Sequence, residues 1–197
     1  QPHILHWNLA RLAEALLPAI TAVRGDDHAA TVALIEGVPG RYYPAMLAQM
    51  RAKLGLTEAH EGDQALVEAL FAAMEGEGAD FTRFFSALTD EVAGGTGATT
   101  TFSALTEWIA AWRARARAEP GTAAGRLALM QAANPMIIPR NHLVEAALTA
   151  AVDGDDYAPF DALLAAVSDP FAPRPADDPM TQPPAPDAPP HVTFCGT

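Results

Sequence analysis

The sequence has a single cysteine, few basic residues and no long apolar run. Cys195 alone excludes an internal disulfide framework and a thiolate zinc cluster, which both need several cysteines. No apolar run reaches about 18 residues without a charge, so we expect no membrane-spanning segment. Lys and Arg total 12 against 24 Asp and Glu, a formal net charge of -12. Such a balance repels phosphates, so neither nucleic acid nor an anionic membrane is an expected partner.

What remains is apolar material for a helical core, since 50% of the 197 residues are hydrophobic. The amount fits one domain, or one domain with a tail. From Pro170 onward prolines crowd together, and such a stretch favours extended polyproline II over helix. We therefore divide the chain into a helical region, residues 1–169, and a Pro-rich extended tail, residues 170–197, which ends in a Cys motif.

Apolar residues recur at helical spacing through the first region, and alternating β-patterns are absent, so we expect an all-α fold. Pro18 is expected to stop the first helix, and 94–101 is expected to be a Gly/Thr-rich loop. The expected helices cover residues 6–17, 30–36, 44–54, 63–74, 81–88, 103–119, 124–133, 139–152 and 157–167.

Two groups of residues have the spacing of metal ligands. His3 and His6 could share a helical face and bind a metal, or they could serve surface and packing roles. The acidic run 153–156 resembles part of a calcium loop, but it lacks the Gly and Glu that such a loop needs. A helix end, a turn and an N-cap explain this run better, and we predict no metal site.

Trp108 and Trp112 lie four residues apart beside Arg113, Arg115 and Arg117. A platform for stacking nucleic-acid bases would need such a set. The acidic balance of the chain instead favours an ordinary core stripe flanked by a solvated arginine face. Glycine-rich phosphate loops, paired catalytic carboxylates and Ser/His/Asp sets are absent from the sequence.

Arg140, Asn141 and His142 follow two prolines and open a predicted helix. These polar side chains could reach another domain or an anion. Alternatively, they could satisfy the end groups of adjacent helices. Cys195, third from the last residue, is either an accessible thiol that reaches a distant partner or an incidental terminal cysteine.

Several segments, taken together and in order, resemble the selenoprotein O family. The opening QPHILHWNL followed by LAEALLP is similar to a QPxIxxWNLxxLAxALLP segment of that family. The other similar segments are MRAKLGL at 50–56, DFT at 80–82, NP at 134–135 with IPRNHL at 138–143, PF at 170–171 and TFCGT at 193–197. Each is modest alone, but jointly they are specific and span nearly the whole chain.

This resemblance implies a fold like that of protein kinases and transfer of AMP from ATP to Ser, Thr or Tyr hydroxyls of proteins. The family's nucleotide-binding lysine, phosphate-binding arginines and Asn/Asp metal ligands all precede the first segment. We therefore expect the catalytic residues upstream of Gln1, with none in this chain. ATP and Mg are expected in the longer protein, and no cofactor is expected on this piece alone.

The resemblance further implies that the chain supports an upstream kinase-like lobe of the same protein, whose partners are protein substrates. Trp7, Asn8, Arg140, Asn141 and His142 are then interdomain or structural candidates. Cys195 occupies a position at which some family members carry selenocysteine, so it is a redox candidate. A cytoplasmic bacterial protein is expected. The alternative is a self-sufficient acidic helical module whose Pro-rich tail is a ligand for a partner protein.

Overall fold

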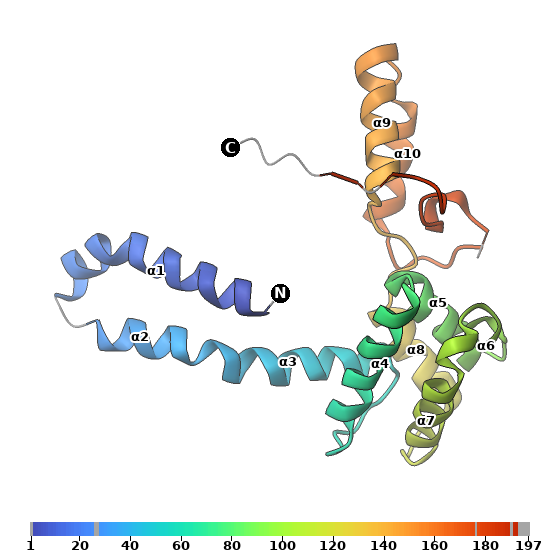
Figure 1. Ribbon diagram of the computed structural model, residues 1–197, viewed down its shortest axis with the longest axis horizontal. Coiled ribbons are helices and arrows are strands. Elements are labelled where there is room, and N and C mark those ends of the chain that lie inside the picture. Colours follow the sequence, from blue (N-terminus) through green and yellow to red (C-terminus); the bar gives the residue numbers. More distant parts are fainter. Residues whose placement is uncertain (1, 26–27, 176, 190, 193–197) are drawn as a thin grey trace. The chain divides into compact units, whose positions relative to one another are not determined.

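The computed structural model describes residues 2–25, 28–175, 177–189 and 191–192 (Figure 1). These residues contain helices and turns but no strand, which confirms the all-α prediction. The chain forms two compact units, Gln1–Met50 and Arg51–Thr197. None of the helices in the described ranges combines the length and apolar character needed to cross a bilayer. The proposed boundary of the Pro-rich tail stays a prediction.

The first unit contains α1 (Pro2–Arg24), α2 (Ala29–Glu36) and most of α3 (Val38–Lys53). Helices α1 and α2 contact each other, and His6 Nε2 lies 3.0 Å from the carbonyl oxygen of Ile35. This contact gives His6 a packing role. Neither α1 nor α2 has a buried residue among those described.

Two expected helix ends in the first unit are wrong. Helix α1 continues past Pro18 to Arg24, because a proline removes only one backbone hydrogen bond, which a helix can tolerate with a kink. Helix α3 begins at Val38 instead of Pro44, since Gly37 keeps a helical φ of -73° and Pro39 suits a first helical turn.

The second unit is built from shorter helices. Its glycine-containing segment 94–101 is not simply a loop, because it includes the short helix α6. The elements are α4 (Asp63–Glu77), α5 (Phe81–Val92), α6 (Gly97–Thr101), η1 (Ser103–Leu105), α7 (Thr106–Arg117), α8 (Ala123–Ala133), α9 (Asn141–Gly154), α10 (Ala158–Ser168) and η2 (Pro179–Thr181).

An aromatic cluster forms the centre of the second unit. Phe84 is fully buried, and its ring centroid lies 5.5 Å from that of Phe85, 5.3 Å from Phe102 and 5.7 Å from Trp108. Trp108 and Trp112 are both buried, and their indole N–H groups donate to backbone carbonyls of Leu66 and Leu54, respectively. These contacts confirm that the tryptophans form a core stripe.

Helices α9 and α10 pack side by side as a hairpin (Figure 1). Between them Asp155 adopts a left-handed φ of 50°, and Asp156 Oδ1 accepts a hydrogen bond of 3.0 Å from the N–H of Ala158. The acidic run is therefore a helix end followed by a turn, as predicted, but the N-cap of α10 is Tyr157 and not a residue of the run. At the base of the hairpin, the N–H of Met136 donates to the carbonyl of Pro170 over 2.7 Å.

Candidate functional site

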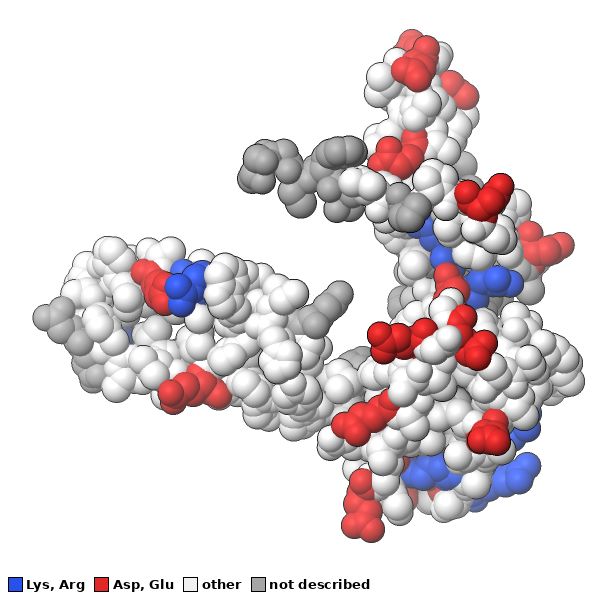
Figure 2. Space-filling model, viewed as in Figure 1, with Lys and Arg blue, Asp and Glu red and all other residues white. Residues whose placement is uncertain are grey.

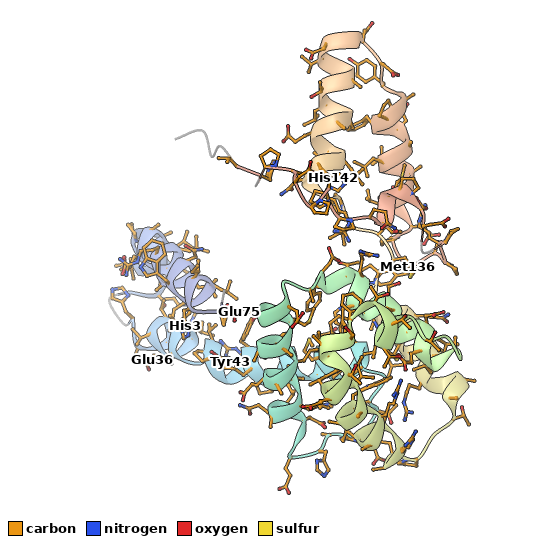
Figure 3. All side chains as sticks on the ribbon, turned by 45° about the vertical axis from the view of Figure 1, so that its right-hand side comes forward. His3, Glu36, Tyr43, Glu75, Met136 and His142 are labelled. Carbon is orange, nitrogen blue, oxygen red and sulfur yellow. The ribbon has the colours of Figure 1, made fainter. Side chains whose placement is uncertain are left out.

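Residues from three of the sequence motifs gather along α5, between its N-cap and Thr89. They are Lys53 at the end of α3, Asp80 before α5, Asn134 after α8 and Arg140 before α9. Figure 3 labels Met136 in the segment that joins α8 to α9, and His142 at the start of α9. We call these four residues the motif cluster.

Asp80 and Arg140 form a forked ion pair in this cluster. Arg140 Nη1 lies 2.6 Å from Asp80 Oδ2, and Arg140 Nη2 lies 3.1 Å from Asp80 Oδ1. Asp80 is also the N-cap of α5, because Oδ1 accepts a hydrogen bond of 2.8 Å from the N–H of Arg83. Burial alone would raise the pKa of Asp80, but the hydrogen bonds from Arg140 and Arg83 hold it below its ordinary value.

Lys53 and Asn134 form the other half of the cluster. The ammonium group of Lys53 donates to the carbonyl of Ala133 over 2.9 Å and lies 3.4 Å from Asn134 Oδ1. Asn134 Nδ2 in turn donates to the carbonyl of Lys53 over 2.9 Å. The Lys53 Nζ atom lies 5.8 Å from the Phe81 ring centroid and 5.4 Å from that of Phe85. Burial lowers the pKa of Lys53.

The motif cluster joins the end of α3, the start of α5 and both ends of the α8–α9 connection. Its charged groups are bonded to one another or to helix ends, which are the backbone groups that otherwise lack partners. This arrangement favours a structural role for Arg140. Of its guanidinium nitrogens, only Nε is buried without a partner among the described residues.

A second polar network fixes the loop between α3 and α4. Arg115 Nε lies 2.8 Å from Asp63 Oδ1, and Arg115 Nη1 lies 2.8 Å from Glu119 Oε1. Glu119 Oε2 accepts a hydrogen bond of 2.8 Å from the N–H of Thr57. Arg115 therefore does not belong to a solvated arginine face. The N-cap of α4 is Gly62, and Asp63 is the first residue of the helix.

The other predicted candidates do not converge. Trp7 is 60% exposed, and the guanidinium of Arg11 lies 5.7 Å from its ring centroid. Asn8 is exposed on α1, Asn141 is exposed at the first position of α9, and His142 beside it is half-buried. Cys195 lies outside the described residues, so its redox role stays a prediction from the sequence.

The sequence contains enough information to predict the motif cluster, but only one of its four residues was predicted as a site residue. Lys53, Asp80 and Asn134 all stand in motifs that led to the family resemblance, yet only Arg140 was named as a site candidate. These three residues could have been identified because each belongs to a motif at the end of a predicted helix. Polar side chains at helix ends often form hydrogen bonds with backbone groups. Within the described residues, no group of three or more His, Cys, Asp or Glu side chains could hold a metal ion.

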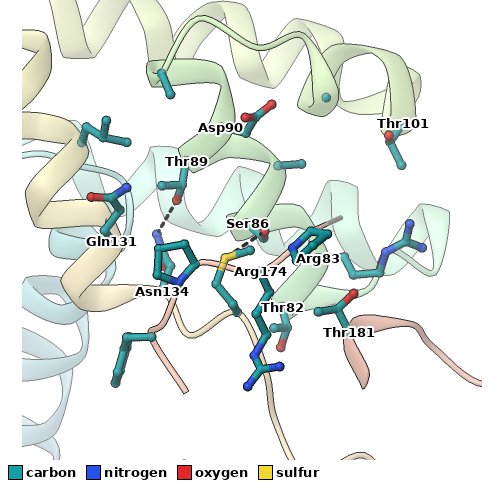
Figure 4. A pocket seen from close by; sticks show the side chains of 18 of the residues that line it. Thr82, Arg83, Ser86, Thr89, Asp90, Thr101, Gln131, Asn134, Arg174 and Thr181 are labelled. Carbon is teal, nitrogen blue, oxygen red and sulfur yellow. Dashed lines mark hydrogen bonds between the residues drawn. The ribbon is translucent and has the colours of Figure 1, made fainter. Parts of the chain in front are cut away.

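A cavity of about 530 Å³ lies against α5 (Figure 4). Its walls come from α5, from α6 and the residue that follows it, from α8 and the residues after it, and from the segment 171–181. Asn134 of the motif cluster lines it, and Asn134 Nδ2 lies 3.2 Å from the hydroxyl of Thr89 in the same wall. No motif in the sequence predicted this cavity, because its residues come from four separate segments.

The buried carboxylates predict acid sensitivity. The pKa of Asp63 and that of Glu119 are also lowered, because hydrogen bonds from Arg115 and backbone N–H groups outweigh the effect of burial, which alone would raise them. A carboxylate with a lower pKa in the folded chain stabilises the fold above its unfolded pKa. That contribution is lost as the pH falls through the folded pKa.

We expect the free energy of unfolding to fall steeply as the pH is lowered from about 5 to about 2. Urea unfolding at a series of pH values measures this change in the free energy of unfolding. Asp63→Asn should flatten the slope, because it removes one of the titrating groups. A free energy of unfolding that stays constant across this range would contradict the lowered pKa values.

Comparisons with known proteins agree with the motifs. The family described as protein adenylyltransferase SelO matches residues 1–168. The protein nucleotidyltransferase YdiU of Bradyrhizobium sp. is 44% identical over 206 positions, which cover 100% of this chain and 41% of the relative. The YdiU proteins of Rhizobium etli and Sphingopyxis alaskensis are each 43% identical with the same coverage. The chain thus spans 41% of the length of these relatives, and it belongs to the SelO family of protein adenylyltransferases.

Proposed function

We propose that the chain is the helical C-terminal part of a longer protein adenylyltransferase, which transfers AMP from ATP to Ser, Thr or Tyr hydroxyls of proteins. Membership in the SelO family supports the reaction class, and coverage of 41% of the relatives supports the presence of a further part. In this proposal the further part is a kinase-like lobe, and the present chain supports it.

The observation that carries the proposal is an uncovered apolar stripe on α1. Leu5, Leu12, Leu16 and Val23 are spaced by seven, four and seven residues, so they lie on one side of the helix. All four are exposed, with Leu12 at 54% and Val23 at 84%. Helix α1 carries only three charged residues, Arg11, Glu14 and Arg24, and the visible face of the first unit is mostly uncharged (Figure 2).

An exposed apolar stripe of this kind marks an interaction surface, because soluble chains seldom leave such a face in water. We assign the kinase-like lobe of the same protein as its partner. The motif cluster would keep the second unit rigid, so that the chain acts as a fixed support. The proposal places ATP and Mg in the lobe and assigns no catalytic step to this chain.

The test compares the longer protein with variants of the α1 stripe. Incubation with labelled ATP and Mg should label hydroxyl side chains of substrate proteins with AMP. Leu12→Asp combined with Leu16→Asp should lower this transfer by about tenfold or more, since it places charge in a buried apolar contact. Val152→Asp is the matched control, because Val152 is 81% exposed on α9 and outside the stripe.

Absence of AMP transfer by the longer protein would reject the proposed reaction. Full transfer by the Leu12→Asp, Leu16→Asp variant would reject the docking of α1 while leaving the reaction in place. If the 197-residue chain alone is monomeric with its stripe intact, the alternative of a self-sufficient interaction module is favoured instead.

A further inference from the structure

The cavity against α5 has the dimensions of a small-molecule site. Its volume of about 530 Å³ lies within the range of ligand pockets in proteins, roughly 300 to 1,000 Å³. Figure 4 shows side chains from α5, α8 and the segment 171–181 around it, including Arg83, Ser86 and Arg174. The cavity lies wholly within the second unit, away from the α1 stripe in sequence.

Two arginines in the wall have unused donors. Among the described residues, the guanidinium group of Arg83 has no hydrogen-bond or ion-pair partner, and its backbone N–H alone bonds Asp80. Arg174 Nη1 lies 3.1 Å from Asp178 Oδ2, but Arg174 Nε is buried with no partner among the described residues. A buried donor without an acceptor costs free energy, so an acceptor at this place would be stabilising.

The charges facing the cavity are unevenly distributed along α5. Arg83 stands at the start of the helix, whereas the carboxylate of Asp90 is seven residues further, roughly 10 Å along the axis. Asp80 is already bonded to Arg140, and Asp178 to Arg174. The charge of Arg83 also acts on Asp80, but the Arg83 guanidinium has no ion-pair partner among the described residues, so its donors remain available at this end of the cavity.

Apolar side chains complete the wall. Met136 and Phe171 line the cavity, and Met136 Sδ accepts a contact of 3.3 Å from the hydroxyl of Ser86. A few charged donors in a mostly apolar wall are typical of sites that orient one charged group of a small ligand. Arginine forks suit carboxylate and phosphate groups in particular.

We propose that this cavity binds a small organic anion, whose carboxylate or phosphate group is held by Arg83 and Arg174 while its apolar body contacts Met136 and Phe171. The site is separate from the AMP-transfer reaction proposed above, and neither proposal depends on the other.

Three probes with the same aromatic ring test the proposal on the 197-residue chain and on the longer protein. Phenyl phosphate and benzoate carry the two candidate anions, and benzyl alcohol is the neutral control. Saturation-transfer NMR detects their binding, and titration gives the dissociation constants. We expect at least one of the two anions to bind, and benzyl alcohol to bind about tenfold more weakly or not at all. The better anion identifies which of the two groups the site prefers.

Variants locate the binding. Arg83→Gln and Arg174→Gln should each raise the dissociation constant of the better anion about tenfold. Arg83→Lys should raise it less, because lysine keeps the positive charge. Arg117→Gln on α7 is the matched control, since Arg117 is exposed and does not line the cavity. Circular dichroism verifies that each variant stays folded. The proposal is overturned if neither anion binds, if benzyl alcohol binds equally well, or if the folded Arg83→Gln and Arg174→Gln variants bind like the Arg117→Gln control.

Discussion

Replacing Asp80 by alanine should lower the free energy of unfolding by about 3 kcal/mol or more. Arg140 is only 8% exposed, and Asp80 supplies both oxygens of its fork. Removing that carboxylate leaves a buried guanidinium without a counter-charge, which costs more than the net value of an intact pair. The same substitution removes the N-cap of α5, worth about 1 kcal/mol.

Urea unfolding followed by circular dichroism measures the loss, and two variants separate its causes. Asp80→Asn keeps a side-chain oxygen that can cap α5 but removes the charge. Its free energy of unfolding should therefore fall less than that of Asp80→Ala. Combining Asp80→Ala with Arg140→Met should recover part of the loss, because the buried charge is then gone as well. If the free energy of unfolding of the Asp80→Ala variant lies within about 0.5 kcal/mol of that of the unsubstituted chain, the ion pair is not a stabilising contact.

Replacing Gly55 by alanine should cost about 3 kcal/mol. Gly55 has a φ of +67°, where a side chain is strained by about 1–2 kcal/mol. An added Cβ would also lie 2.3 Å from Arg126 Cγ and 2.9 Å from Met130 Sδ. Met130 is fully buried, so it cannot move away without disturbing the core, and overpacking adds about 1–3 kcal/mol.

Two other glycines are matched controls for this experiment. Gly78 has a similar φ of +61°, but a Cβ there would meet nothing within 4 Å, so Gly78→Ala should show the strain alone, about 1–2 kcal/mol. Gly76 lies inside α4 with open space around it, and Gly76→Ala should stabilise the chain by about 0.5–1 kcal/mol. Equal losses at Gly55 and Gly78 would show that the approach of Met130 does not matter.

These two predictions concern the support that the proposed function requires. Asp80 and Gly55 belong to two of the motifs shared with the family, and both act at the ends of helices. Gly55 ends the α3 segment that carries Lys53, and the carbonyl of Gly55 accepts a hydrogen bond of 3.1 Å from Arg126 Nε. Loss of either residue should loosen the connections between helices.

Local sequence was enough for most of the secondary structure and for the family. Apolar spacing predicted α4, α8 and α10 to within a few residues, because an amphipathic helix repeats every 3.6 residues whatever it packs against. The cap that Asp80 supplies to α5 is local as well, because it bonds the N–H of a residue only three positions further. Where Pro18 was expected to end the first helix, the neighbouring helix-forming residues prevailed.

The pairings that hold the second unit together came only from the tertiary structure. Arg140 finds Asp80 across 60 residues, and Arg115 finds Asp63 across 52. Arg113, Arg115 and Arg117 could not be distinguished by sequence. Residues two positions apart point to different sides of a helix, and Arg115 is the one that reaches the buried carboxylate of Asp63. Periodicity shows which face of a helix is apolar, but not which distant residue a polar side chain will meet.

On α1, by contrast, the structure shows side chains that lack a partner among the described residues of the first unit. The apolar residues of this helix recur at helical spacing, and the structure leaves Leu12 and Leu16 exposed. The sequence thus determined that α1 has a surface requiring a partner, because hydrophobic spacing is a local property. Only the structure showed that α2, which contacts α1 in the first unit, leaves Leu12 and Leu16 exposed, since burial depends on which elements pack against a helix.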